Sequence, residues 1–410
     1  MQYFYAATSI IIHPLPITYL TMKFIAYFRR PYLIGCLAAA SGLCFSLPIH
    51  AQSLLPGYNP TELADILMVS VRTGSGSSYY SDSNYVAAST RFQRAYRSPE
   101  MGLLNLWELW TDNRNTAIIS VRGTLPNPDS WLSNFYSAMI PAKGEIILPG
   151  NDTVPYQVAD HPMAAVHVGW MISTAYLGKD ILPRLDSLYK KGYRNLMITG
   201  HSQGGGISYL LTAHLRQWQK QQKIASDWQI KTYSTAAPKP GNVYFAYDYE
   251  AATRGGWAFN VVNSIDWVPE MPISVQTVGD FNQINPFTNA KDIIGKQKFP
   301  TNWALRYMYN RLDKPTRRAE KNFEKYLGKI MGKRVTEKLV GLQVPPFVHT
   351  INYARVGETI VLRPDEGYFT RFPNNPDKIF VHHFHQPYIY LVNKSLLDST
   401  SIHAASGTNK

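Results

Sequence analysis

The pentapeptide Gly200–Gly204 (G-H-S-Q-G) holds a serine between two glycines. Between a strand and a helix, this pattern is typical of a sharp turn that exposes a nucleophilic hydroxyl. A serine hydroxyl is hardly ionised at neutral pH, so Ser202 needs a base, and imidazole suits because its pKa lies near the working pH. The imidazole in turn needs a carboxylate that fixes its tautomer. These residues predict attack on an acyl carbonyl, with a histidine and a carboxylate supplied from elsewhere in the chain.

The sequence around Ser202 predicts the elements that such a turn requires. The apolar run 196–198 predicts a buried strand, and the apolar residues Ile207, Leu210, Leu211 and Leu215 mark one face of a following helix. Further strands are expected at 116–121, 230–235, 259–263 and 359–362, whereas 138–165 is expected to be loop. Strands that alternate with helices predict an α/β fold with a mostly parallel central sheet and helices on both faces.

We expect Asp266 to be the carboxylate. It follows the strand 259–263, and the carboxyl ends of parallel strands meet at the edge of the sheet where the Ser202 turn also lies. Asp248 and Asp280 are weaker alternatives, and a role for Asp266 in capping a turn stays open. With this type of turn the usual chain order is serine, acid, histidine. The base is therefore expected near the C-terminus.

We expect the base to be His385, which is followed by Gln386-Pro387-Tyr388. His382 and His383 are close alternatives and His349 is a distant one. Neighbouring histidines at the end of a strand, here 379–381, cannot all point into one site.

Two groups are expected to hold the negative charge that develops on the carbonyl oxygen. Backbone N–H groups aimed at this oxygen stabilise it. One is the amide of Gln203, directly after the nucleophile. The other is expected in the loop after the strand 116–121, where Thr124 could donate through its amide and its hydroxyl. The alternative is that this loop is a simple turn.

The first 51 residues differ from the rest. A basic stretch, an apolar stretch at 33–47 and a small residue at Ala51 predict a signal peptide, preceded by a short extension and cleaved after Ala51. Both cysteines, Cys36 and Cys44, lie in this segment, so the predicted mature chain has no disulfide, thiol nucleophile or cysteine metal site. We therefore expect a secreted or periplasmic protein.

Residues 52–400 are expected to form one domain, followed by a polar tail at 401–410. Within the domain, 286–345 forms a basic insertion with 14 Lys and Arg against five Asp and Glu, and a helix is expected to start near Asp313 and Pro315. The net charge of the chain is +13 and no nucleic-acid motif accompanies it, so an anionic membrane or envelope surface is the favoured partner. The alternative that the chain is simply a basic, soluble protein stays open. The insertion is either a cap over the site, a membrane-facing patch or an ordinary peripheral helix.

Taken in order, these motifs resemble those of the class 3 lipases, the fungal-type lipases of the α/β-hydrolase superfamily. The matching segments are Ile118–Thr124, Asp129–Leu132, Val166–Trp170, Gly200–Gly205, Ala237–Asn242, Asn263–Pro269 and His385–Tyr388. The resemblance covers roughly 110–275 and 345–395. It implies an α/β-hydrolase fold, the triad Ser202, Asp266 and His385, and a lid helix around Trp131. Gln203 replaces the leucine usual in the family, and the family's disulfides are absent.

We predict a serine ester hydrolase, a lipase or esterase that acts on acylglycerols or phospholipids through an acyl-enzyme. No metal or organic cofactor and no nucleic-acid partner is expected. Two other functions stay open. One is the cleavage of amides or peptides by the same residues, and the other is non-catalytic binding of lipid or cell envelope by the same scaffold.

Overall fold

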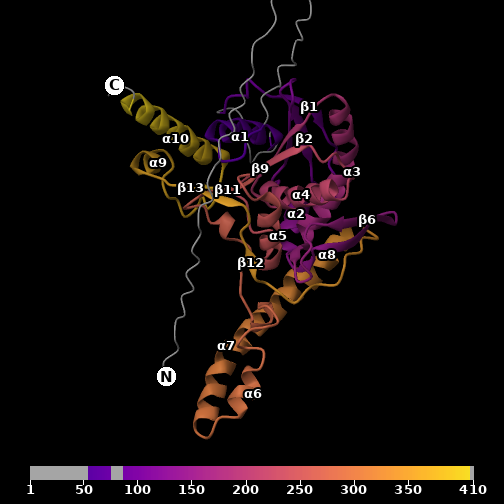
Figure 1. The fold of residues 1–410 in the computed structure, drawn as a ribbon, viewed down its shortest axis with the longest axis vertical. Coiled ribbons are helices and arrows are strands. Elements are labelled where there is room, and N and C mark those ends of the chain that lie inside the picture. Colours follow the sequence, from indigo (N-terminus) through magenta and orange to yellow (C-terminus); the bar gives the residue numbers. More distant parts are fainter. Residues whose placement is uncertain (1–53, 75–85, 407–410) are drawn as a thin grey trace, which may run out of the picture. The chain divides into compact units, whose positions relative to one another are not determined.

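The computed structural model describes residues 54–74 and 86–406. The expected leader, its cleavage site after Ala51 and the last four residues of the polar tail lie outside the described residues. In the described part, the unit Ala51–Lys410 is built around a seven-stranded sheet (Figure 1). In spatial order its strands are β1 (Gln93–Arg97), β2 (Trp107–Thr111), β3 (Thr116–Val121), β8 (Asn195–His201), β9 (Gln229–Thr235), β11 (Ala258–Asn263) and β13 (Glu358–Leu362).

The strand directions confirm the predicted α/β fold with a mostly parallel sheet. From β3 to β13, each strand pairs with its neighbour in parallel, whereas β1, β2 and β3 form antiparallel pairs. The carboxyl ends of β8 and β11 consequently lie at the same edge of the sheet. This edge is where Ser202 and Asp266 follow their strands.

Alternating side chains of the strands pack against helices on both faces, as predicted. Ile118 and Met197 belong to one hydrophobic core and Ile119 and Ile198 to the other, because successive residues of a strand point to opposite faces. The helices of the first core are α1 (Pro60–Gly74) and α10 (His385–Ser406), which pack on each other. Those of the second are α3 (Val168–Lys190) and α4 (Gln203–Lys220).

The expectation that 138–165 is loop is wrong. A second sheet has the order β12-β10-β7-β4, and β5 and β6 form an antiparallel hairpin. The strands concerned are β4 (Met139–Pro141), β5 (Lys143–Leu148), β6 (Asp152–Gln157), β7 (Ala165–His167), β10 (Gly241–Asn242) and β12 (Tyr353–Ala354). Most of these strands are too short to show an alternating pattern, and their partners lie far away in the sequence.

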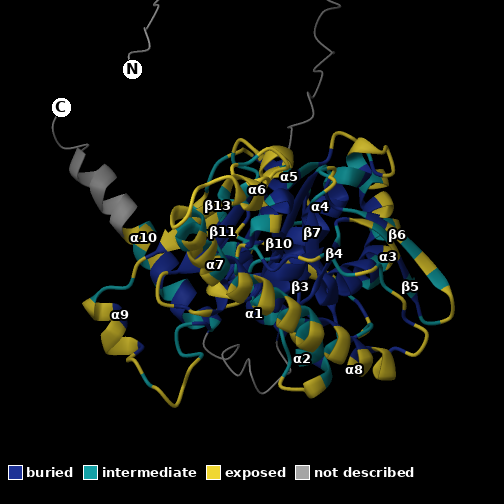
Figure 2. Ribbon diagram, turned by 90° about the horizontal axis from the view of Figure 1, so that it is seen from below, coloured by how far each residue is buried: buried dark blue, intermediate teal, exposed yellow. Residues whose placement is uncertain are grey.

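The basic insertion is helical. Its elements are α6 (Ala290–Gly295), α7 (Thr301–Phe323), the π-helical turn η4 (Glu324–Ile330) and α8 (Met331–Lys338). The expected helix start at Asp313 and Pro315 is wrong, because α7 begins at Thr301 and contains Pro315. A proline inside a helix removes one hydrogen bond, here the one to the carbonyl of Arg311, without ending the helix. Figure 2 shows α7 as largely exposed.

Smaller helices complete the described part of the chain. They are α2 (Pro128–Phe135), α5 (Val243–Thr253), η2 (Val268–Glu270), η3 (Val278–Asp280) and α9 (Glu366–Arg371). Among residues 54–74 and 86–406, no helix has the length and apolar character needed to cross a membrane.

Candidate active site

Ser202 occupies the turn between β8 and α4. Its backbone has a φ of 60° and a ψ of −129°, a conformation that residues with a side chain rarely adopt. The flanking glycines permit the turn. A Cβ on Gly200 would lie 2.2 Å from the carbonyl of Gly204, and a Cβ on Gly204 would lie 2.3 Å from the carbonyl oxygen of Val121. The turn therefore holds the serine hydroxyl clear of the backbone at the N-terminus of α4.

A chain of hydrogen bonds links Ser202 to Asp266 through His383. Nε2 of His383 lies 2.8 Å from Oγ of Ser202, and its Nδ1 lies 2.8 Å from Oδ2 of Asp266. The side chain of Asp266 is fully buried and that of His383 is 7% exposed. With its proton on Nδ1, His383 donates to Asp266 and accepts the hydroxyl proton of Ser202 through Nε2. This geometry lets the imidazole remove the serine proton.

The expectation that His385 is the base is wrong. Nε2 of His385 lies 3.0 Å from Oγ of Ser70 on α1, and its ring stacks on His201 with centroids 4.0 Å apart. Residues 379–381 form a turn and not the expected strand, and α10 begins at His385. In a strand, two residues that are two positions apart point to the same face. His383 lies in a turn and His385 begins a helix, so their side chains point in different directions. His383 consequently faces Ser202, whereas His385 faces the core between α1 and α10.

The remaining candidates lie away from Ser202. His382 contacts Tyr368 and Asn374, His349 contacts Glu324, Asp248 accepts the amides of Asp160 and His161, and Asp280 accepts from Thr277 and Thr350. Within the residues that the structure describes, no three His, Cys, Asp or Glu side chains are grouped as metal ligands.

Asp266 is held by two donors that the sequence analysis did not identify. The phenol of Tyr388 donates to Oδ2 at 2.8 Å, and the amide of Val268 donates to Oδ1 at 3.0 Å. The Tyr388 oxygen also accepts the amide of Asn263 at 3.0 Å. Burial, together with the neighbouring carboxylate, raises the pKa of Tyr388 well above its ordinary value, so the phenol stays protonated as a donor. No local sequence signal indicated this role, because the position of Tyr388 depends on where α10 begins.

A buried imidazole, His201, holds the backbone of His383. Its Nε2 lies 2.6 Å from the carbonyl oxygen of His383, and its Nδ1 lies 2.9 Å from Oγ1 of Thr235. Burial, together with neighbouring histidines, lowers the pKa of His201 well below its ordinary value and that of His385 to about 3. Both rings are therefore neutral at pH 7. His201 donates from Nε2 to the His383 carbonyl and so fixes the residue that faces Ser202.

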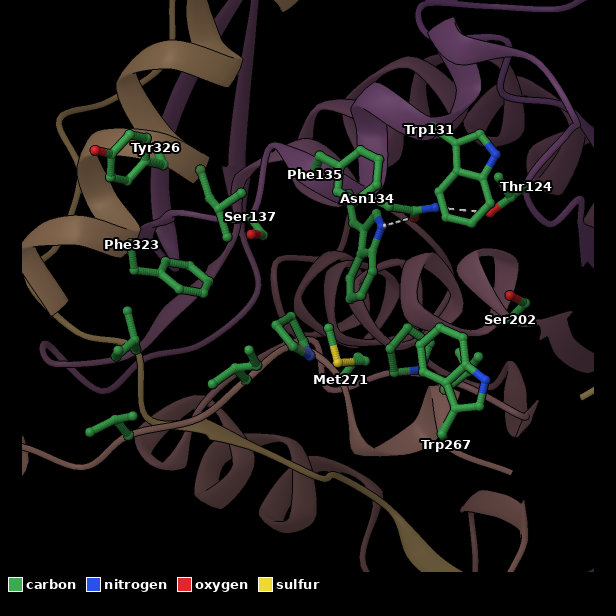
Figure 3. A pocket seen from close by; sticks show the side chains of 18 of the residues that line it. Thr124, Trp131, Asn134, Phe135, Ser137, Ser202, Trp267, Met271, Phe323 and Tyr326 are labelled. Atoms are coloured by element: carbon green, nitrogen blue, oxygen red, sulfur yellow. Dashed lines mark hydrogen bonds between the residues drawn. The ribbon is translucent and has the colours of Figure 1, made fainter. Parts of the chain in front are cut away.

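Thr124 and Gln203 both lie beside Ser202. Thr124 follows β3 and lines the same cavity as Ser202. Its hydroxyl oxygen accepts a hydrogen bond from Nδ2 of Asn134 at 2.9 Å, which leaves the hydroxyl hydrogen for another acceptor (Figure 3). Asn134 is fixed in turn by Nε1 of Trp170 at 3.1 Å. Gln203 is the first residue of α4, so helix geometry gives its N–H no acceptor within the helix.

Ser202 opens onto a mostly apolar cavity of about 540 Å³. Its walls come from α2, the segment after Asp266, the helical insertion and the turn before His383. Representative residues are Trp131, Phe135, Trp267, Met271, Ala319, Phe323, Tyr326 and Phe380. Figure 3 shows Ser202 and Thr124 on one side of the cavity and Phe323 and Tyr326 on the opposite side. The insertion thus supplies the wall that lies farthest from the nucleophile.

Aromatic rings close the end of the cavity near Ser202. The ring of Phe380 lies 6.4 Å from that of Trp131 on α2 and 5.4 Å from that of Trp267, measured between centroids. It also lies 5.8 Å from the ring of His383. A movement of α2 would therefore change the aromatic contacts beside the nucleophile.

Comparisons with known proteins relate part of the chain, including Ser202 and Asp266, to a family. Residues 118–276 match the sequence model of the family described as Lipase (class 3). Among solved structures, the Rhizomucor miehei lipase propeptide complex is 18% identical over 52% of this chain, with a TM-score of 0.37. The match spans 63% of that lipase chain, which is less than two thirds of its length.

Two further fungal lipases are similarly distant. The lipase from Rhizopus microsporus var. chinensis is 20% identical over 55% of this chain and 75% of its own, with a TM-score of 0.37. Lipase II from Rhizopus niveus is 17% identical over 53% of this chain and 77% of its own, also with a TM-score of 0.37. No curated protein matches the chain in sequence.

Proposed function

We propose that the chain is a carboxylic ester hydrolase that cleaves acyl esters of lipids through a covalent acyl-enzyme on Ser202, because residues 118–276 match the class 3 lipase family. One observation carries the proposal. The hydrogen-bonded series Ser202–His383–Asp266 opens onto a cavity whose walls are mostly apolar. A polar catalytic centre at one end of an apolar cavity fits a substrate with an ester group and an acyl chain.

The residues take defined roles in the proposed reaction. Ser202 Oγ attacks the acyl carbon while Nε2 of His383 removes its proton, and Asp266 stabilises the imidazolium that forms. The amides of Thr124 and Gln203 hold the negative oxygen of the tetrahedral intermediate. His383 then gives the proton to the leaving alcohol. In the second half of the reaction, His383 removes a proton from water, which attacks the acyl-enzyme and releases the fatty acid and Ser202.

The aromatic residues around Ser202 support a role for α2 as a gate over the cavity. Trp131 and Phe135 on α2 line the cavity and stack on each other with centroids 5.6 Å apart. We propose that α2 moves to admit a lipid and then returns to exclude water from the acyl-enzyme.

The test is hydrolysis of p-nitrophenyl esters of increasing acyl length, with Ser202→Ala, His383→Ala and His385→Ala as matched variants. Ser202→Ala and His383→Ala are expected to lower kcat by more than about 1,000-fold, since they remove the nucleophile and its base. His385→Ala is expected to keep at least about a tenth of kcat once folding is verified by circular dichroism, because His385 faces Ser70 and not the nucleophile.

Other results would redirect the assignment. Labelling of Ser202 by a fluorophosphonate, with turnover of peptides but not of esters, would favour an amide-cleaving enzyme. A folded protein that neither turns over esters nor reacts with the fluorophosphonate would be a non-catalytic binding protein.

We also propose that the chain is exported, on the basis of its leader-like N-terminus. Expression in a bacterium with a secretory pathway, followed by N-terminal sequencing of the exported protein, tests this point. A mature protein that starts at Gln52 is the expected product. Retention of the full chain inside the cell would contradict the proposal.

A further inference from the structure

The first part of the helical insertion and the segment just before it expose large apolar side chains to solvent. Between residues 281 and 312 these include Ile284 (98% exposed), Phe299 (81%), Leu312 (75%) and Trp303 (65%). In Figure 1, α6 and the first half of α7 lie side by side, away from the central sheet. Contiguous exposed apolar residues in a soluble domain mark a surface that meets a partner or a lipid phase.

The same region is strongly basic. Residues 281–318 contain eight Lys and Arg against two Asp. One of the two acids, Asp313, is buried and accepts a hydrogen bond from Arg317 at 2.8 Å. The surface around the apolar side chains is consequently positive, which favours a partner that combines negative charge with an apolar interior.

Two aromatic side chains and one basic side chain follow one another along one side of α7. The rings of Trp303 and Tyr307 stack with centroids 6.0 Å apart, and the guanidinium of Arg311 lies 5.6 Å from the centre of the Tyr307 ring. Successive residues of this row are four positions apart, so all three lie on one side of the helix. Trp and Tyr prefer the interface of a membrane, and Arg pairs with phosphate there.

A second side of α7 connects this surface with the cavity. Met308, Leu312, Pro315, Ala319 and Phe323 follow one another at intervals of three or four residues, which places them on one helical face. The first three are exposed, whereas Ala319 and Phe323 line the cavity onto which Ser202 opens. This apolar face therefore runs from solvent into the site.

We propose that α6 and the first half of α7 dock on an anionic phospholipid surface, and that the apolar face of α7 guides an acyl chain from this surface to Ser202. The delivery of substrate rests on the proposed function, whereas the docking does not. The basic side chains would contact the phosphates and Trp303 would lie at the interface, while Phe299 and Leu312 enter the acyl region.

The test measures co-sedimentation of the full chain with vesicles of phosphatidylcholine alone or mixed with phosphatidylglycerol. The double variant Phe299→Glu/Leu312→Glu removes two exposed apolar groups and adds negative charge. It is expected to weaken binding to the mixed vesicles at least about tenfold, because each buried side chain contributes on that scale. Leu55→Glu is the matched control, since Leu55 is 64% exposed but lies outside the insertion.

Each result bears on the docking surface. Binding of the wild type that prefers the mixed vesicles, weakens with added NaCl and survives Leu55→Glu is the expected outcome. Equal binding by the double variant and the wild type would overturn the proposed surface, and equal binding to both vesicle types would overturn its electrostatic basis.

A second assay separates docking from chemistry. The double variant should hydrolyse soluble p-nitrophenyl acetate at the wild-type rate, because neither residue lines the cavity, and lose turnover only on vesicle-borne esters. If the wild type binds vesicles but hydrolyses no ester, the proposed function fails while the docking surface stands. If the double variant loses vesicle binding but keeps full turnover of vesicle-borne esters, delivery along α7 is refuted.

Discussion

The phenol of Tyr388 donates a hydrogen bond to Oδ2 of Asp266, the same carboxylate oxygen that faces Nδ1 of His383. One oxygen of the buried carboxylate thus has two donors, one from the proposed base and one from α10. The second donor spreads the negative charge of Asp266 and fixes the direction in which the carboxylate points.

The variant Tyr388→Phe is expected to lower kcat about tenfold with little change in KM, because Asp266 then orients the imidazolium less well in the transition state. It is also expected to lower the free energy of unfolding by about 1–3 kcal/mol, since the amide of Asn263 loses its acceptor. Steady-state kinetics and urea unfolding measure the two effects. Tyr390→Phe on the same helix is the control, and an unchanged kcat in Tyr388→Phe would remove the positioning role.

Thr124→Val is expected to lower kcat by about ten- to a hundredfold if the hydroxyl donates to the oxyanion, since removing one such donor has effects of that order or larger. KM should change little, because the interaction forms only in the transition state. Thr124→Ser keeps the hydroxyl and its acceptor role toward Asn134, so it should retain most of the activity. Equal kinetics for the valine and serine variants would assign the oxyanion contact to the backbone alone.

The far wall of the cavity is expected to set the preferred acyl length. Each methylene buried in the cavity contributes about 0.8 kcal/mol, or roughly fourfold in kcat/KM, until the chain meets the wall. Phe323→Ala should therefore move the optimum toward longer p-nitrophenyl esters, and Ala319→Phe should move it toward shorter ones. Profiles that do not shift in either variant would show that the acyl chain does not reach the insertion.

Buried histidines are expected to make the fold sensitive to acid. Burial lowers the pKa of His385 to about 3, whereas in the unfolded chain a histidine has a pKa of about 6.5. Below pH 6.5 the unfolded chain binds a proton that the folded chain does not bind. Stability is thus full above this pH and falls toward pH 3 by about 1.4 kcal/mol per pH unit for this residue.

Urea unfolding at pH 7 and pH 5 checks this expectation with two variants. His385→Gln should reduce the loss of stability between the two pH values, because it removes the titrating group. Ser70→Ala removes a hydrogen-bond partner of His385 but keeps the imidazole. This variant should therefore lose as much stability between pH 7 and pH 5 as the wild type does. The same loss of stability in His385→Gln and the wild type would contradict the assignment.

Local sequence signals were sufficient to place Ser202 and Asp266 at the same edge of the sheet. The glycines around Ser202 and the apolar strand before Asp266 are features of contiguous residues, and a parallel sheet brings such strand ends together. Local sequence signals were not sufficient to choose between His383 and His385, because this choice depends on where α10 begins. That boundary is decided by the packing of His385 and Tyr388 against distant residues and not by the residues next to them.

The helical insertion shows a second limit of prediction from the sequence. Its charge and helical pattern were visible in the sequence, but its contribution to the cavity was not. Phe323 lines the cavity only because the helical insertion returns to the segment after α2, where the carbonyl of Leu327 accepts the amides of Ser137 and Ala138. Contacts of this kind join parts of the chain that no periodic pattern connects.

The sequence separation between Ser202 and His383 has a consequence for biosynthesis. Ser202 and His383 are 181 residues apart, and the loop that carries His383 is held by α10, which packs on α1 from the other end of the described chain. A ribosome delivers these segments in order, N-terminus first. The growing polypeptide therefore contains Ser202 long before His383, so the proposed catalytic series can assemble only after residue 383 has been synthesised.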